Sequence, residues 1–430
     1  MNKIQPSARY KQVLNELLEG GLSQTQKDSS STFIGEFIKC AIQRFVTEAL
    51  EQEVSDYLGR DYYHRRNSNE ELTGYRNGYE MGRLKTAEGA IPVERPQVRD
   101  TEEPFQSRLW QLLKQRTPAL ENIVIESYVR GLATRDVEDL FSDAEGHSLI
   151  SKDGVSELTD QLWDDYKTFC QRDLSVFDIE YLFVDAVFES MRLQIGLKEA
   201  VLVAWAITRN GQRALIHMAL GNKESCDCWL DFFRNMISRG LNVPVLITSD
   251  GAPGLIKAIE EAFPKSLRQR CLVHKKRNIL AKLPEDAQAE IRAYLDGIWF
   301  APTYETGKTA AQEFIRRFEP LYPSAIASFK EDMDASLQHL KCPAKHRKAI
   351  RTTNLLERAF GEQKRRTKVI PRFFNEKSCL KLVFATLIRT SQRWNKVPMT
   401  VKEQLELSIL RKQLFKPIDP EPSPCVTKVA

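Results

Sequence analysis

The sequence predicts a mixed α/β fold with a central sheet, and two observations lead to this class. Apolar, β-rich runs separated by short turns occupy residues 181–188, 200–208 and 213–220. A helical segment then precedes each of two further runs, at 243–249 and around 268–273. Three strands followed by helix, strand, helix and strand is the order of an RNase H-like fold. In that fold an antiparallel meander is extended by parallel strands through right-handed crossovers.

The region before the sheet is expected to be mainly helical. Residues 33–58 carry apolar residues at helical spacing, which predicts a long amphipathic helix. Residues 59–100 are rich in Tyr, Arg, Asn and Gly and predict a small β-hairpin or irregular module. Three helices follow at 118–170, where Thr134 can cap the second and Ser151 the third.

These three helices are compatible with a helix-turn-helix module that binds DNA, but plain helical packing explains them equally well. The start of the third helix, Ser151 and Lys152, suits contact with phosphates. The rest of that helix would repel them, because it carries Asp153, Glu157, Asp160, Asp164 and Asp165.

The region after the fifth strand is expected to interrupt the sheet domain. Residues 284–340 look wholly helical, and further helices are expected from Asn354 and at 377–394. The predicted regions are an N-terminal helical and hairpin region (1–110), a helix-turn-helix-like region (111–176), an RNase H-like domain (177–283 and 346–400), a helical insertion (284–345) and a C-terminal tail (401–430).

Composition favours a globular protein of 430 residues, with 42% hydrophobic and 28% charged residues. The formal net charge of +5 does not by itself indicate nucleic-acid binding. We expect a cytoplasmic protein, since the start lacks a signal-peptide core and no apolar run approaches the roughly 18–20 residues of a membrane span. The eight scattered cysteines are expected to be reduced, and the Pro-rich tail from Pro417 to be disordered.

Two aspartates fall where a metal site could form. Asp185 interrupts the apolar run YLFVDAVF, and Asp250 ends the run VPVLITSD just before a turn. Alone, the first could face water at a sheet edge and the second could be a turn residue or helix cap. In the predicted order, however, their strands are parallel neighbours, so both carboxylates reach one crevice. Mg²⁺ prefers such oxygen ligands, and two ions there could activate water and stabilise the leaving oxygen of a phosphodiester.

Glu357 is the candidate for a third carboxylate. Its alternative role is structural, because Asn354 followed three residues later by Glu357 is a capping-box pattern. The surrounding sequence is basic: residues 341–372 hold eleven Lys or Arg against two acids, Glu357 and Glu362. Residues 268–282 add six basic residues and no acid.

Two basic runs beside a carboxylate pocket suggest a bound polyanion, although such a run is usually a solvated face. The candidate DNA contacts are Lys275, Lys276, Arg277, Arg351, Arg358, Lys364, Arg365 and Arg366, together with Ser151 and Lys152.

Two further features allow more than one interpretation. Cys271 and His274 have metal-ligand spacing, but no second pair lies at a zinc-finger distance. Trp299 could stack on an extruded base, but its neighbours Ile298 and Phe300 favour a buried anchor. His217 is expected to be an ordinary sheet residue.

Taken together, these residues resemble the Mutator-type transposases of bacterial insertion sequences. The stretches that carry the resemblance span most of residues 70–400, and their order and spacing are specific. They are Arg76-Asn-Gly-Tyr79, Arg130-Gly-Leu-Ala-Thr-Arg135, Asp185, Glu224-Ser with Trp229, Ser238-Arg-Gly-Leu241, Ser249-Asp-Gly251 with Gly254-Leu255, Gln269-Arg-Cys271 with His274-Lys275 and Arg277-Asn278, Ala301-Pro302, and Arg351-Thr-Thr-Asn354 with Glu357.

The resemblance implies an RNase H-like catalytic domain with an aspartate–aspartate–glutamate triad, here Asp185, Asp250 and Glu357, and a helical insertion before the glutamate. It implies two Mg²⁺ ions, with Mn²⁺ as a substitute, and DNA as substrate: the element's terminal inverted repeats and a target. Paired ends imply at least a homodimer. The family also carries the cysteine–histidine pair seen at Cys271 and His274. Ser190 and Glu80 depart from the family, which has basic residues there.

The expected reaction is cleavage by metal-activated water, after which the freed 3′-hydroxyl attacks a second phosphodiester. Two alternatives remain. An RNase H-like nuclease such as a junction resolvase would hydrolyse without strand joining. A domesticated DNA-binding regulator would be favoured by loss of any one carboxylate, and all three are present.

Overall fold

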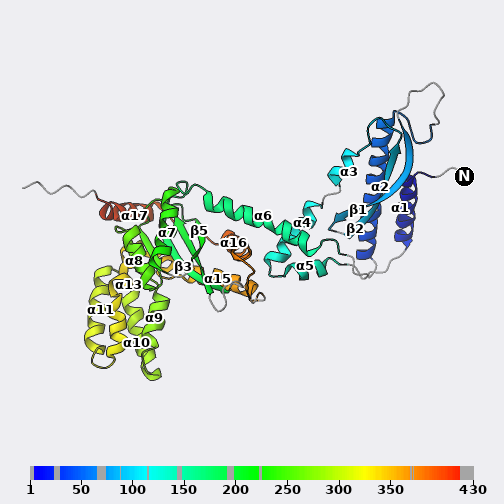
Figure 1. Cartoon of the computed structure of the whole chain (residues 1–430). Coiled ribbons are helices and arrows are strands. Elements are labelled where there is room, and N and C mark those ends of the chain that lie inside the picture. The colour runs from blue at the N-terminus through cyan, green and yellow to red at the C-terminus, as the bar shows by residue number, and fades with distance from the viewer. Residues whose placement is uncertain are drawn as a thin grey trace, which may run out of the picture. The chain divides into compact units, whose positions relative to one another are not determined.

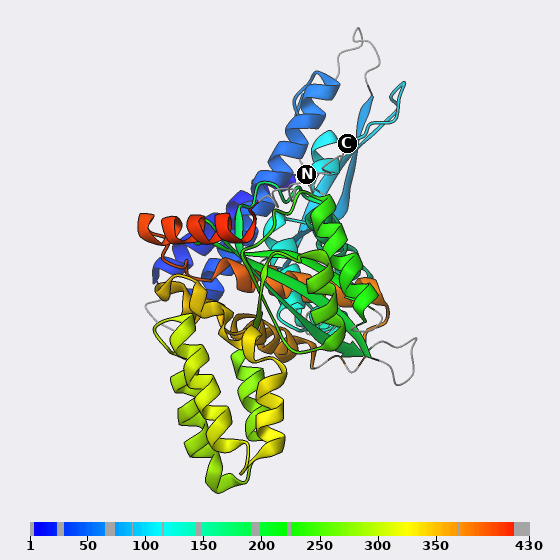
Figure 2. The same cartoon turned by 90° about the vertical axis from the view of Figure 1, so that its left-hand side faces the viewer.

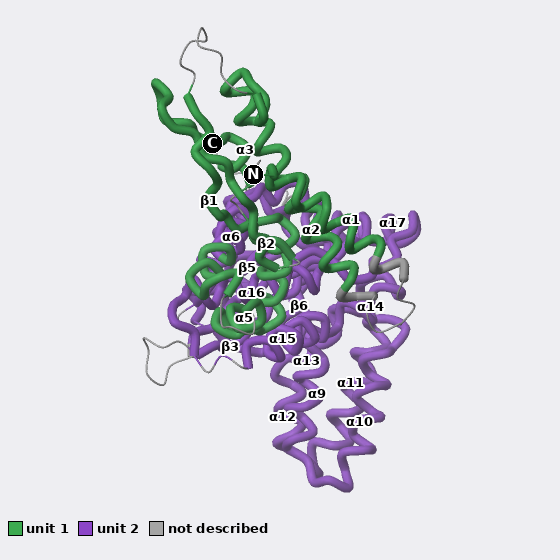
Figure 3. The backbone as a smooth tube through the Cα atoms, turned by 90° about the vertical axis from the view of Figure 1, so that its right-hand side faces the viewer, with its two compact units in different colours: residues 1–159 green, residues 160–430 purple. Residues whose placement is uncertain are grey.

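The computed structural model describes residues 4–23, 30–64, 74–87, 89–113, 116–142, 148–190, 198–221, 225–368, 370 and 372–416. The expected disordered tail from Pro417 and the motif residue Glu224 lie outside these residues. The chain divides into two compact units, Met1–Thr159 and Asp160–Ala430 (Figure 3). Among the described residues, none of the helices combines the length and apolarity that crossing a membrane requires.

Unit 1 is built on two helices and a long hairpin. Helices α1 (Pro6–Ser23) and α2 (Ser30–Leu58) precede strands β1 (Tyr75–Thr86) and β2 (Gly89–Arg99), which pair antiparallel as predicted (Figure 1). Leu50 of α2 packs on the hairpin's apolar face, which includes Ile91 and Val93.

The Arg76–Tyr79 stretch that carries part of the family resemblance forms an irregularity in this hairpin. The strand register shifts between Arg76 and Tyr79, and Gly78 has a φ of 78°, which glycine adopts without steric cost. The Arg76 guanidinium donates to the backbone oxygen of Arg60 at 2.8 Å, and the Tyr79 hydroxyl donates to Glu51 at 3.0 Å. These hydrogen bonds connect the hairpin to α2 and to the residues that directly follow it.

Unit 1 continues with α3 (Arg108–Leu113), α4 (Pro118–Val129), α5 (Thr134–Leu140) and the first part of α6 (Lys152–Gln171). The predicted cap at Thr134 is wrong by one residue: Ala133 is the N-cap, and its N–H donates to Asp136 at 2.9 Å. The cap at Ser151 is confirmed, since its Oγ accepts from the Gly154 N–H at 3.2 Å.

The predicted sheet is present in unit 2. Its strands are β3 (Ile179–Ser190), β4 (Lys198–Thr208), β5 (Arg213–Gly221), β6 (Leu246–Ser249) and β7 (Leu267–Arg270), in the spatial order β5-β4-β3-β6-β7. The first three form an antiparallel meander, and β6 and β7 add in parallel, as the sequence predicts. Strand β7 is shorter than expected, because helix α9 begins at Leu272.

The two faces of β3 have different neighbours. Leu182 and Val184 pack into a core with helices α7 (Cys226–Ser238) and α8 (Pro253–Ala262). Side chains alternate along a strand, so Tyr181 and Asp185 point to the opposite face. There the Tyr181 hydroxyl lies 2.8 Å from Nδ1 of His346, on helix α14 (Ala344–Ile350).

A helical bundle with its own core follows the sheet strands (Figure 2). It contains α9 (Leu272–Leu280), α10 (Glu285–Trp299), α11 (Tyr304–Phe318), α12 (Pro323–Glu331), α13 (Met333–Leu337) and the short 3₁₀ helix Gln338–Lys341. Because Leu272 and Ile279 belong to this core, the helical body begins before residue 284.

The chain then returns to the sheet through α14, α15 (Asn354–Thr367) and α16 (Glu376–Gln392). Helix α17 (Val401–Leu414) occupies part of the expected C-terminal tail. It packs through the buried Leu407 and pairs Arg411 with Glu180 of β3 at 2.9 Å.

Candidate active site

Strands β3 and β6 place two aspartates beside each other. Phe183 lies opposite Thr248 in the parallel register, so Asp185 and Asp250, each two residues further on, lie at the same level. Asp185 is 8% exposed, and its Oδ1 accepts from the Ala186 N–H at 2.9 Å. Oδ1 of Asp250 accepts from the Ala252 N–H at 3.1 Å, at the start of α8. The predicted adjacency of the two strands is confirmed.

Burial and a neighbouring carboxylate both disfavour the ionised form of Asp185. Burial, and secondly the carboxylate of Asp250, raise the pKa of Asp185 to about 7. The hydrogen bond from the Ala186 N–H, and after it the charge of His274, oppose this rise in the pKa. Two carboxylates in one partly dry crevice repel each other unless a proton or a cation lies between them.

Glu357 lies on α15, and the structure argues against its capping role. The N-cap of α15 is Thr353 rather than Asn354, and no side chain caps this helix. The Glu357 side chain is 33% exposed, and its Oε1 lies 3.2 Å from Nε2 of His274. This contact is out of line for a hydrogen bond, so Oε1 has no hydrogen-bond partner among the described residues.

Cys271 and His274 lie next to Glu357. Cys271 is fully buried at the start of α9, and its Sγ accepts from both the N–H and the hydroxyl of Thr353, at 3.3 Å each. Burial alone would raise the pKa of Cys271, but the neighbouring His274 and Thr353 lower it below its usual value. The Cys271 sulfur in turn raises the pKa of His274 against the effect of burial, and Asp185 and Glu357 add to this rise.

The three predicted carboxylates do not form a closed cage. Among the described residues, the one set of three potential metal donors within 4.8 Å of one another is Cys271, His274 and Glu357. His274 interacts electrostatically with both Asp185 and Glu357. Sequence spacing suggests Cys271 and His274 as a pair but misses Thr353, because no local pattern relates positions 82 residues apart.

The candidate DNA contacts differ in exposure. Lys275 is 2% exposed and faces the charge of Asp332, which argues against contact with a phosphate. Arg365 and Arg366 pair with Glu362, the other acid of the basic run 341–372, at 2.9 and 2.8 Å, so part of their charge is neutralised within the protein.

The other candidates are accessible but lie in separate places. Arg358 and Lys364 are exposed on α15, and Ser151 and Lys152 are exposed at the start of α6 in unit 1. Lys276, Arg277 and Arg351 line a pocket beside α9. Trp299 is 1% exposed within the bundle core, which matches a buried anchor, although its ring borders the same pocket. His217 is buried in β5, stacked on Phe232.

The family described as "Transposase, Mutator family" matches residues 15–397 of this chain. A transposase for insertion sequence element ISRM5 from Rhizobium meliloti (strain 1021) is 30% identical over 82% of this chain and 87% of its own length. A transposase for element IS6120 from Mycolicibacterium smegmatis is 33% identical over 63% of this chain and 84% of its own. A solved structure, the Drosophila P element transposase strand transfer complex, is 12% identical over 70% of this chain and 94% of its own, with a TM-score of 0.25.

Proposed function

The chain belongs to the Mutator family of transposases, and we propose that it cuts DNA at the ends of its own element and joins them to a target with the carboxylates Asp185, Asp250 and Glu357. Its curated relatives are transposases of insertion sequences. We further propose that unit 2 is an RNase H-like catalytic domain. The strand order β5-β4-β3-β6-β7, with its antiparallel meander and parallel additions, supports this assignment.

The observation that carries the proposal is the pairing of Asp185 and Asp250 on neighbouring parallel strands. Because Asp185 is buried and is repelled by Asp250, two ionised carboxylates side by side are unfavourable without a cation. Oxygen donors in such a pair suit Mg²⁺ or Mn²⁺. A divalent cation there would activate a water and stabilise the leaving 3′-oxygen.

The chain's own residues would orient this chemistry. The Ala186 and Ala252 N–H groups fix one oxygen of each aspartate, leaving the other free for a ligand. Glu357 contributes the third carboxylate once its side chain turns from His274 toward the aspartates. Cys271, held by Thr353, supports the position of His274 beside that carboxylate.

Cys271, His274 and Glu357 could instead hold a softer metal such as Zn²⁺. The two hydrogen bonds that Thr353 donates to the Cys271 sulfur favour an internally satisfied group over a metal ligand. We therefore propose that the cysteine–histidine pair is structural support for the carboxylates.

The deciding experiment is a strand-transfer assay with the full chain, a labelled duplex carrying the element's terminus, a supercoiled plasmid and Mg²⁺. We expect labelled ends joined to the plasmid, and no joining by Asp185→Asn. Cleavage without joining would favour a nuclease. Binding without cleavage would favour a regulator. Activity is expected from at least a dimer, since two ends must be joined together.

A further inference from the structure

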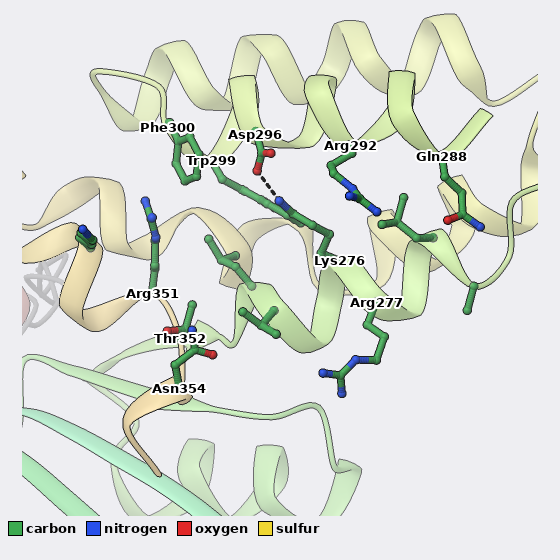
Figure 4. A pocket seen from close by; sticks show the side chains of 15 residues that line it. Lys276, Arg277, Gln288, Arg292, Asp296, Trp299, Phe300, Arg351, Thr352 and Asn354 are labelled. Carbon is green, nitrogen blue, oxygen red and sulfur yellow. Dashed lines mark hydrogen bonds and ion pairs between the residues drawn. The ribbon is translucent and has the colours of Figure 1, made fainter. Parts of the chain in front are cut away.

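A pocket of about 740 Å³ lies between α9, α10 and the start of α15 (Figure 4). We propose that it binds one unstacked nucleotide of the DNA strand that passes Glu357. The base would lie on the apolar side of the pocket, and its phosphates on the cations at the rim. DNA as the ligand rests on the proposed function, but the site itself rests on the side chains below.

Among the residues that line the pocket, lysines and arginines outnumber the one carboxylate, Asp296. Lys276 pairs with Asp296. Arg277, Arg292 and Lys348 also line the pocket and form no salt bridge with any residue that the structure describes. Cations that converge without carboxylate partners attract an anion, and phosphate is the anion that DNA offers.

The opposite part of the pocket suits a nucleobase. Phe300, just after α10, is 54% exposed, and the Arg351 guanidinium lies 4.2 Å from its ring centroid. An aromatic ring and a guanidinium plane are surfaces on which bases stack. The neighbouring Trp299 lies in the bundle core and contributes to the apolar lining of the pocket.

The pocket adjoins the proposed active site. Helix α9 carries Val273 and Lys276 at the pocket and His274 at Glu357. Asn354 borders the pocket one helical turn before Glu357 on α15. A strand whose scissile phosphate lies at the carboxylates therefore has a neighbouring nucleotide within reach. A paired and stacked base presents no face to Phe300, so the nucleotide must leave the stack.

The test measures the binding of terminal duplexes in which a single mismatch is placed at successive positions near the cut, with Ca²⁺ in place of Mg²⁺. A mismatch lowers the cost of unstacking. We expect about tenfold tighter binding by the wild type at one position and loss of that gain with an abasic nucleotide there. Phe300→Ala should abolish the gain, while Phe374→Ala, at an exposed phenylalanine outside the pocket (68% exposed), should keep it.

Three further readouts make the outcome decisive. Arg292→Gln with Lys348→Gln should reduce the salt dependence by about one unit for each phosphate that is no longer neutralised, and Arg316→Gln, at a cation outside this pocket, should not. Cleavage of the paired terminus with no mismatch gain anywhere would overturn the pocket assignment and leave the proposed function standing. Failure to bind or cleave any terminus would overturn both. Competition by free deoxyadenosine monophosphate as strong as by the duplex would also overturn the pocket assignment, because the ligand would then be a free nucleotide.

Discussion

Asp185 is the residue whose environment departs most from that of an ordinary aspartate, and its pKa has a consequence for stability. Burial and Asp250 raise that pKa to about 7, from about 4 in an unfolded chain. The folded state therefore favours the protonated form. This stabilising contribution is fully present below pH 4 and is lost as the pH rises through 7.

We predict that Asp185→Asn removes this loss of stability at high pH in the metal-free protein. With chelator present, the variant should exceed the wild type in free energy of unfolding by about 4 kcal/mol at pH 8 and by close to nothing at pH 4. Urea unfolding of both proteins across this range measures the difference. Mg²⁺ at pH 8 should stabilise the wild type alone. Parallel pH profiles for the two proteins would contradict the assignment.

The triad substitutions test the chemistry at the residue scale. Asp185→Asn, Asp250→Asn and Glu357→Gln keep shape but remove a charged ligand, and each should lower the rate of end cleavage 10²-fold or more. DNA binding should survive, because it depends on basic surfaces. Glu357 is decisive, since Gln would serve equally well in a helix cap. A Glu357→Gln protein that cleaves at the wild-type rate would move the third ligand elsewhere.

The position of Arg270 explains why residue 251, directly after Asp250, is a glycine. A Cβ at this position would lie 2.2 Å from Cζ of Arg270, whose side chain is nearly buried. The close approach of the guanidinium to the chain beside Asp250 therefore requires glycine. The turn Ser249-Asp-Gly251 thus places Asp250, a proposed metal ligand, beside a residue small enough for the neighbouring arginine.

Among the elements, α15 carries both the proposed third carboxylate and several of the candidate DNA contacts. Its first turn carries Glu357, and its last turn carries Lys364, Arg365 and Arg366. Glu362 already pairs with the two arginines, so the helix presents less free charge than its sequence suggests.

We predict that Lys364→Gln, Arg365→Gln and Arg366→Gln together weaken binding to all DNA sequences alike. The salt slope should flatten by about one unit for each phosphate that these side chains no longer neutralise, with a smaller share from the paired arginines than from Lys364. Filter binding between about 50 and 200 mM salt measures the slope. Lys308→Gln, on α11, is the matched control. An unchanged slope would mean that these residues form only a solvated face.

At the scale of the whole of unit 2, a buried charge cluster connects the sheet with the helical bundle. Asp332, between α12 and α13, pairs with Arg268 at 2.9 Å and with Arg270 at 3.4 Å, both on β7. The side chains are 18%, 10% and 7% exposed for Arg268, Asp332 and Arg270, so removing the carboxylate leaves two poorly solvated cations without their shared partner.

We predict that Asp332→Asn lowers the free energy of unfolding by about 3 kcal/mol or more. Asp286→Asn, at an exposed position on α10, should change it by less than about 0.5 kcal/mol. Chemical unfolding of both variants provides the comparison. Equal stability of the two would show that the cluster contributes little to the junction.

Local patterns are sufficient to predict the elements and the order of the sheet. Apolar, β-rich runs separated by short turns identify β3, β4 and β5, and the rules of strand connection predict that Asp185 and Asp250 are neighbours. Helix α17 lies in the expected C-terminal tail and is not predicted, and further errors fall at element ends, such as the cap at Thr134 and the last residues of β7. Ends depend on single hydrogen bonds, which periodicity does not report.

Only the tertiary structure decided what surrounds those aspartates. The contacts of Cys271 with Thr353 and of His274 with Glu357 join segments more than 80 residues apart. The burial of Lys275 separates it from the exposed cations beside it in the sequence. The sequence by itself determined the family, because its motifs recur in a specific order and spacing. It also determined the strand order and the pair of carboxylates, because apolar runs and connection rules encode them. Packing between distant helices determined the partner of Glu357 and the pocket at Phe300, because side-chain positions there depend on every element that contacts them.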